Sequence, residues 1–340
     1  MDPEHFLRLL PEGWRPWEEV AVRAGLSLAQ VRALAYALRA AGYPVLLAEE
    51  RGVGLEPGCP APQFVLPRLR GRLGRPYRYL GTVSSTQEVL RAWAGVPEGA
   101  LVVAERQTAG RGRLGRAWLS PPGNLYLSLL LRGPPPHLLP LRVGVALAQA
   151  AGCGRLKWPN DLLSPDGRKL GGILIEAERH RLLVGVGVNV AKAPLPTAAA
   201  LQEFRAVRRV DLLVEFLELL EGWLACPVAR VLRTWQELDG TLGKEVRVRT
   251  PQGVVEGVAE GLTPEGGLRV RTAQGERVIR VGEVGLPPPE DVVDPQEGEG
   301  EAQGGGSGEG EGEGPGAAVE EGQHVAHGGV REAREEKEEE

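Results

Sequence analysis

The sequence predicts an α+β protein with an N-terminal winged helix-turn-helix, a central mixed sheet with helices, a C-terminal SH3-like barrel and a disordered acidic tail. Three successive patterns predict this order. Short amphipathic helices come first, strands apolar on both faces follow among longer helices, and strands alternating with a period of two come last. The expected boundaries are 1–56 for the winged helix-turn-helix, 57–64 for a Pro-rich linker, 65–237 for the central domain, 240–286 for the barrel and 287–340 for the tail.

The N-terminal module is predicted from a turn between two helices. Gly25 offers the tight turn, and Ser27 is placed to N-cap a helix over 28–41. Two short strands, 44–47 and 53–55, then form a wing. An ordinary small helical module is the alternative interpretation.

The central domain combines buried strands with helices. Its strands are expected at 101–106, 125–131, 156–158, 172–177 and 182–190. Its helices are expected at 86–94, 138–151 and 212–224. Ser85 and Glu88 have the spacing of a capping box at the start of the first helix.

The C-terminal region changes character twice. The segments 244–249, 267–271 and 277–281 alternate with period two and are separated by Pro/Gly turns, which suits a small barrel. Beyond Pro287 the chain is rich in Gly and Glu, and from Glu290 to Glu340 it carries 17 acidic against 3 basic side chains. We expect this tail to be disordered, because it has too little apolar surface to offset chain entropy.

Composition excludes several classes of protein. No run of 18 apolar residues exists, so no membrane span is predicted. The first residues lack the features of a signal peptide, and the three cysteines have no paired spacing. These features exclude a disulfide scaffold and a Cys-based zinc site, and we expect a cytoplasmic protein.

The segment Gly110-Arg111-Gly112-Arg113-Leu114-Gly115-Arg116 matches G-x-G-x-x-G, the dinucleotide fingerprint. A dinucleotide site needs a helix after the glycines and an acidic residue about 20 residues further on. Here a strand follows, and no Asp or Glu occurs between Glu105 and Asp161. We therefore interpret the loop as a mobile clamp for an anion, with backbone N–H groups and arginine forks as donors.

Two further polar segments flank buried strands. Lys157-Trp158-Pro159-Asn160-Asp161 places Asn160 and Asp161 at a strand end, and Lys169 precedes the pair Gly171-Gly172, which permits close approach of a ligand. The histidines lie outside every motif and no G-x-S-x-G elbow occurs, so nucleophilic hydrolysis is excluded. The remaining chemistry is positional and electrostatic: cations hold a carboxylate and a phosphate.

Together these motifs resemble those of biotin protein ligases. The segments that carry the resemblance are Ser84-Ser85-Thr86-Gln87, Glu105 to Arg113, Lys157 to Asp161, Lys169 to Leu174 and Gly185 to Asn189, in the family's order. The chain is similar to the bifunctional form, whose N-terminal winged helix represses biotin genes. The resemblance extends from residue 1 to about 286.

The resemblance implies a class II synthetase-like biotin/lipoate-ligase fold and two half-reactions. Biotin and Mg·ATP give biotinyl-5′-adenylate and pyrophosphate, and the biotinyl group then passes to a lysine of a biotin carboxyl carrier domain. Operator DNA of biotin genes is implied as a further partner, and so is a homodimer. ATP and Mg²⁺ are the implied cofactors, with biotin as substrate.

The resemblance also implies roles for individual residues. Lys169, Arg111 and Arg113 are expected to be catalytic, Asp161 to contact Mg²⁺, and Gln30, Arg32 and Arg39 to contact DNA. The family's biotin contacts match Ser85, Thr86, Gln87, Gln107, Arg111, Gly112, Arg113 and Lys169. From the residues themselves we expect Arg116, Trp118, Gly172 and Asn189 to contact biotin or the adenylate as well, with a place in the core as the alternative for Trp118. Gln87 departs from the more usual Asn, which should change a hydrogen bond but not the reaction.

Three rival functions are weighed against this one. A lipoate ligase would share the catalytic fold, but the Gly-Arg-Gly-Arg loop and Lys-Trp-Pro-Asn-Asp favour biotin. The intact catalytic motifs argue against a pure DNA-binding repressor, and the missing acidic residue and helix argue against a nicotinamide oxidoreductase. Residues 1–60 carry six arginines against eight acidic residues, so any DNA binding is expected to be weak.

Overall fold

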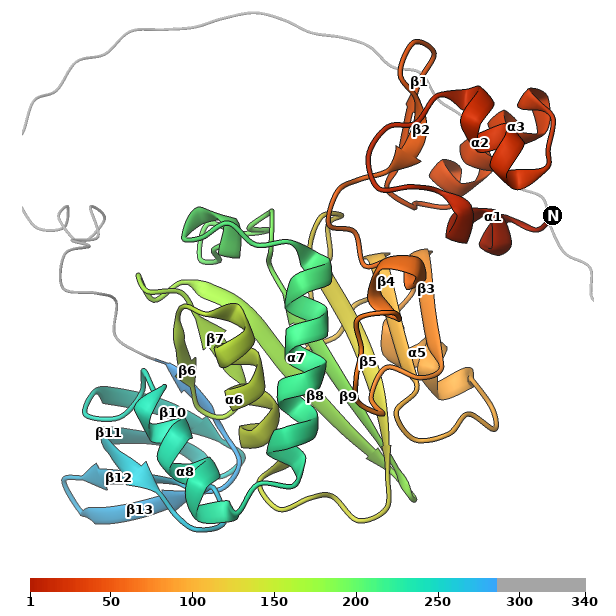
Figure 1. The fold of residues 1–340 in the computed structure, drawn as a ribbon. Helices are drawn as coiled ribbons and strands as arrows, with labels where there is room; N and C mark the ends of the chain where they lie inside the picture. Colours follow the sequence, from red (N-terminus) through yellow and green to blue (C-terminus); the bar gives the residue numbers. More distant parts are fainter. Residues whose placement is uncertain (286–340) are drawn as a thin grey trace, which may run out of the picture. The chain divides into compact units, whose positions relative to one another are not determined.

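The computed structural model describes residues 1–285, so the predicted acidic tail lies outside the described residues. The fold of these residues is α+β, as predicted (Figure 1). None of the described helices is both long and apolar enough to cross a membrane.

The N-terminal residues form three helices and a two-stranded antiparallel sheet. The elements are α1 (Pro3–Leu9), α2 (Trp17–Ala24), α3 (Leu28–Ala40), β1 (Val45–Ala48) and β2 (Gly52–Leu55). Ser27 caps α3 as expected: its hydroxyl accepts from the Gln30 N–H, and the Gln30 side chain accepts from the Ser27 N–H. Gly25, with φ of 65°, ends α2 in the left-handed conformation.

The segment expected to be a linker is packed rather than exposed. Cys59 and Ala61 are fully buried, and the Tyr77 hydroxyl donates to the Pro60 carbonyl at 2.5 Å. The short helix α4 (Pro62–Val65) follows. The apolar residues among the prolines account for this burial, since they join the main hydrophobic core.

A seven-stranded mixed sheet forms the centre of the molecule, in the order β3-β4-β5-β9-β8-β7-β6. Its strands are β3 (Tyr77–Val83), β4 (Leu101–Gln107), β5 (Leu125–Arg132), β6 (Arg155–Lys157), β7 (Asp161–Leu163), β8 (Lys169–Glu178) and β9 (Arg181–Val188). The helices are α5 (Thr86–Ala92), α6 (Leu139–Ala151), α7 (Arg209–Leu224) and α8 (Val228–Glu237), with short 3-10 turns at Arg113–Gly115 and Leu201–Glu203. Only β3 and β4 pair in parallel.

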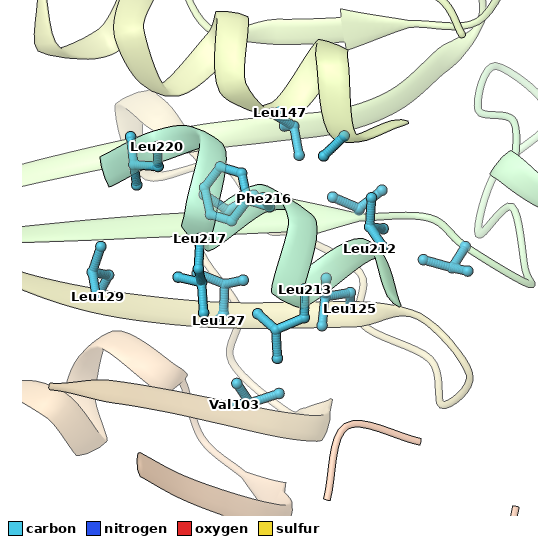
Figure 2. Packing of buried hydrophobic residues seen from close by; sticks show 14 of the residues in the cluster. Val103, Leu125, Leu127, Leu129, Leu147, Leu212, Leu213, Phe216, Leu217 and Leu220 are labelled. Carbon is cyan, nitrogen blue, oxygen red and sulfur yellow. The ribbon is translucent and has the colours of Figure 1, made fainter. Parts of the chain in front are cut away.

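One face of this sheet holds the main core. Helix α7 packs Leu213, Phe216 and Leu217 over the sheet side chains Val103 and Leu127 (Figure 2). Burying each such side chain stabilises the fold by about 1.5–3 kcal/mol. A smaller cluster under α5, which includes Leu90, Val102, Leu130 and Leu183, covers part of the opposite face.

The C-terminal described residues form a five-stranded antiparallel sheet in the order β13-β12-β11-β10-β14. Its strands are β10 (Glu245–Thr250), β11 (Gly253–Leu262), β12 (Leu268–Thr272), β13 (Gly275–Ile279) and β14 (Glu283–Gly285). The alternation predicted for 244–249 is real, because Val246 and Val248 are buried while Arg247 and Arg249 are not. Its description as an SH3-like barrel stays a prediction.

Candidate active site

A cavity of about 210 Å³ opens on the side of the central sheet that carries α5. It is lined by all twelve residues expected to contact a ligand: Ser85, Thr86, Gln87, Gln107, Arg111, Gly112, Arg113, Arg116, Trp118, Lys169, Gly172 and Asn189. Segments separated by up to about a hundred positions in sequence therefore meet at one place.

Alternation along β8 and β9 creates the floor of this cavity. Val184, Val186 and Val188 are buried in the main core, so the intervening Gly185 and Gly187 lie on the cavity face. A Cβ atom at Gly185 would lie 3.1–3.3 Å from the Gln87 amide, and one at Gly187 would lie 2.5 Å from Trp118 Nε1. A side chain at Gly187 would therefore displace Trp118 from the sheet, whereas one at Gly185 would require a small shift of Gln87.

Gly172 lines the cavity beside the Trp118 ring, where a Cβ atom on it would lie 3.0 Å from Trp118 Cζ3. Trp118 Nε1 and Asn189 Oδ1 are buried, and the residues described here supply neither with a hydrogen-bond partner. Both atoms belong to side chains that line the cavity.

The inner end of the cavity is neutral and polar. The Gln107 side-chain oxygen accepts from the Thr86 N–H at 2.8 Å, and the Thr86 hydroxyl lies 2.8 Å from that of Ser128. The Gln107 amide nitrogen donates to the Ser120 hydroxyl at 3.0 Å. Motif reasoning missed Ser120 and Ser128; the signal for Ser128 was a hydroxyl side chain between apolar residues of β5.

The capping box predicted for α5 is wrong. The Ser85 side chain accepts no capping hydrogen bond and lines the cavity instead, while Glu88 pairs with Arg91 and Arg111. The N–H of Thr86, the first residue of α5, is satisfied by Gln107. Residues distant in sequence therefore replace the hydrogen bonds of the predicted capping box.

The Arg/Gly loop borders the mouth of the cavity. Arg111 pairs with Glu88, and Arg116 pairs with Glu283 at β14. Arg113 donates to Asn160 Oδ1 at 3.0 Å and to the Gly282 carbonyl at 3.2 Å, and burial lowers the pKa of its guanidinium. The loop thus reaches both the Lys-Trp-Pro-Asn-Asp turn and the C-terminal sheet.

Lys169 stands at the start of β8 with its ammonium 2.7 Å from the Asp161 carboxylate and 5.4 Å from the centre of the Trp118 ring. A second cation, Lys157, was not assigned a role from sequence. Burial lowers the pKa of the Lys157 ammonium, although Asp161 opposes this shift. Its position in the same Lys-Trp-Pro-Asn-Asp motif was the signal that could have found it.

Asp161, expected to contact Mg²⁺, is paired with Lys169, and its role toward a metal ion stays a prediction. Within residues 1–285, no group of three or more His, Cys, Asp or Glu side chains is arranged to hold a metal ion. A single carboxylate fits Mg²⁺ only where phosphates and water supply the other ligands.

The three residues expected to contact DNA lie on α3, and two of them are engaged elsewhere. Gln30 completes the cap of α3. Arg32 forms two contacts of 2.6 and 2.7 Å with Glu49 of the β1–β2 turn, and its guanidinium lies 5.0 Å from the centre of the Trp17 ring. Arg39 is exposed in the last turn.

Electrostatically, the cavity joins a neutral polar end to a mouth rich in cations. This suits a ligand that carries a polar uncharged end and an anionic group. Comparison with known proteins agrees with this geometry. Residues 80–191 match the model of the biotin/lipoate A/B protein ligase family, and residues 241–286 match the biotin protein ligase C-terminal domain.

The bifunctional ligase/repressor BirA of Bacillus subtilis is 33% identical over 282 residues, which cover 73% of this chain and 86% of that protein. The chain belongs to the biotin protein ligase family. The biotin–[acetyl-CoA-carboxylase] ligase of Paracoccus denitrificans is 34% identical over 236 residues, with 60% of this chain and 97% of that protein covered. This biotin protein ligase is an enzyme, and every residue that lines its cavity between Ser85 and Asn189 lies within the family match.

Solved structures agree with this assignment. The biotin protein ligase of Aquifex aeolicus in complex with biotin and ATP superposes with a TM-score of 0.56 at 33% identity, over 62% of this chain and 97% of that one.

Proposed function

We propose that this ligase joins biotin to a lysine of a biotin carboxyl carrier domain through biotinyl-5′-adenylate. The biotin carboxylate attacks the α-phosphate of ATP and pyrophosphate leaves. The carrier lysine amine then attacks the acyl carbon, AMP leaves, and the amine proton passes to solvent. The observation that carries this proposal is the single cavity in which a neutral polar end leads to Lys169 and the arginine loop.

Each part of the cavity has a proposed task. Ser85, Thr86, Gln87 and Gln107 bind the uncharged head of biotin, because their hydroxyls and amides match its polar groups. Lys169 neutralises the biotin carboxylate and the α-phosphate, which lowers the repulsion between two anions that must meet. The remaining ligand contacts come from residues at the mouth: Arg111, Gly112, Arg113, Arg116, Trp118, Gly172 and Asn189.

Mg²⁺ would be held mainly by the phosphates of ATP, and Asp161, which pairs with Lys169, would add one carboxylate. The bound ion would supply charge neutralisation at these phosphates. The Aquifex aeolicus relative solved with biotin and ATP supports the same pair of substrates here.

Biotin-dependent exchange of labelled pyrophosphate into ATP tests this function directly. We expect exchange with biotin and none with lipoate at equal concentration. Exchange with lipoate alone would instead establish a lipoate ligase.

The arginine loop yields a prediction about retention of the intermediate. We expect Arg111→Ala and Arg113→Ala to form the adenylate slowly and to release it, because the cations that cover a reactive anhydride are gone. The measurement is labelling of bystander proteins by radioactive biotin. Arg277→Ala, at an exposed position of β13, is the control. Retention of the adenylate as tight as in the unaltered enzyme would contradict the clamp role.

We also propose a second function, biotin-responsive repression with weak DNA binding. The bifunctional ligase/repressor of Bacillus subtilis and the helices α2 and α3 followed by the β1–β2 hairpin support it. The weakness follows from charge, because Arg32 is neutralised by Glu49 and the first 60 residues have more acidic than basic side chains.

We expect the protein alone to bind DNA upstream of biotin genes poorly, and binding to rise with biotin plus ATP because a homodimer doubles the contacts. Gel-shift titration at low and moderate salt measures this. Glu49→Gln should tighten binding, since it frees Arg32 for phosphate. Tight, salt-resistant binding without ligand would refute the charge argument.

A further inference from the structure

Part of the cavity wall is an irregular segment that follows β9. Asn189, Pro194, Leu195, Thr197 and Ala198 of this segment line the cavity, yet residues 190–197 belong to no helix or strand. Such a segment needs partners outside itself to hold a fixed shape.

One buried side chain supplies these partners at the start of the segment. Asn124, which is fully buried, accepts from the N–H groups of Val190, Ala191 and Lys192 at 2.9, 3.0 and 3.0 Å. Its amide nitrogen donates to the Lys192 carbonyl at 2.9 Å. Asn124 itself does not line the cavity.

The far end of the same segment is bonded to the backbone of the catalytic lysine. The Lys169 N–H donates to the Thr197 carbonyl at 3.1 Å, and the Lys169 carbonyl accepts from the Ala199 N–H at 3.0 Å. The Asn189 side chain also donates to the Lys169 carbonyl, at 3.2 Å. The segment therefore runs from Asn124 to the base of Lys169.

The backbone of Asn124 is held in turn by a buried ion pair. Arg209 donates to both oxygens of Glu105 at 2.7 Å and to the Asn124 carbonyl at 3.3 Å. Burial lowers the pKa of the Arg209 guanidinium, but Glu105, Tyr79 and Cys59 together raise it by more, so the pKa is raised overall. Arg209, a charged donor at the start of α7, thus holds the backbone of Asn124, and Asn124 in turn holds residues 190–192.

We propose that Asn124 is a positioning residue for biotin activation. It holds residues 190–192, and through residues 194–198 it sets the cavity wall and the backbone position of Lys169. The inference rests on the proposed role of Lys169. A displacement of about 1 Å at a reacting group costs about 10²-fold in rate, so loosening this segment should lower kcat.

Two variants of Asn124 separate positioning from folding. Asn124→Leu removes all four hydrogen bonds at similar volume, and we expect kcat for biotin-dependent pyrophosphate exchange to fall about 10²-fold. Asn124→Asp keeps an oxygen for the three N–H groups and should recover most of this loss. Hydrogen exchange should quicken at the amides of Val190, Ala191 and Lys192 in the Leu variant alone.

Arg142→Met is the matched control. Arg142 is buried and donates to the carbonyls of His137, Trp223 and Cys226, on the α6–α7 side of the sheet and away from the cavity. It should lower the melting temperature without changing kcat or the KM for biotin. The proposal is overturned if Asn124→Leu has the same kcat and KM for biotin as Arg142→Met. It is also overturned if hydrogen exchange quickens at residues 190–192 without a loss of kcat.

If Asn124→Leu does not fold, variants at the exposed residue Lys192 test the same proposal. Lys192→Pro removes one of the three N–H donors at an exposed position, whereas Lys192→Ala removes only the side chain. We expect the proline variant alone to lose kcat, and equal activity of the two would contradict the proposal. An unaltered chain without biotin-dependent exchange would instead refute the proposed function itself.

Discussion

We expect Lys169→Ala to lower the rate of adenylate synthesis by about 10²-fold or more while the fold is retained. The Lys169 ammonium lies 2.7 Å from the Asp161 carboxylate and 5.4 Å from the centre of the Trp118 ring. The hydrogen bonds of Lys169 to residues 197 and 199 are made by its main chain. The substitution therefore removes a charge and leaves the strand pairing in place. Biotin-dependent pyrophosphate exchange measures the rate, and circular dichroism checks the fold.

Lys244→Ala provides the control, because Lys244 is an exposed lysine beside β10. It should leave the exchange rate unchanged. A Lys169→Ala enzyme that forms the adenylate at a near-normal rate would remove the proposed catalytic role.

The second large effect concerns stability. Glu105 and Arg209 form a buried ion pair at 2.7 Å, with side chains 1% and 7% exposed, and the Tyr79 hydroxyl also donates to Glu105. Burial and the nearby Glu105 carboxylate hold the pKa of Tyr79 well above its usual value. We expect Glu105→Gln to lower the free energy of unfolding by about 3–5 kcal/mol, because it leaves Arg209 buried without a counter-charge.

Urea unfolding measures this effect. Glu256→Gln breaks an exposed pair with Arg247 and should cost less than about 1 kcal/mol. The double variant Glu105→Leu with Arg209→Met should be more stable than Glu105→Gln, since it leaves no unpaired charge. If Glu105→Gln and Glu256→Gln lower the free energy of unfolding equally, the buried ion pair stabilises the fold no more than the exposed one.

Local signals predicted the regular elements well. The helix begun by Ser27 and the apolar strands β5 and β9 appear within two residues of their predicted bounds. The three-residue strands β7 and β14 were missed because so short a strand depends on its neighbours: β14 pairs with β10, more than thirty residues earlier. β11 was also missed, since Gly257 and Gly261 interrupt its alternation.

The cavity was predictable where it is built from motifs. Residues of the Ser85 to Gln87, Arg111 to Trp118 and Lys169 to Gly172 segments do meet. Contacts between motifs were not predictable, because they depend on tertiary packing. The pairing of Lys169 with Asp161, the resting place of Trp118 on Gly187 and the engagement of Arg32 by Glu49 all belong to this kind.

We propose that one cavity activates biotin and delivers it to a carrier lysine. Incubation of the protein with labelled biotin, Mg·ATP and a biotin carboxyl carrier domain tests it most directly, with a carrier whose acceptor lysine is replaced by arginine as control. We expect biotinyl-adenylate in the absence of carrier, and one biotinyl group on the acceptor lysine in the presence of carrier. Formation of neither the adenylate nor the modified carrier by the folded protein would contradict it.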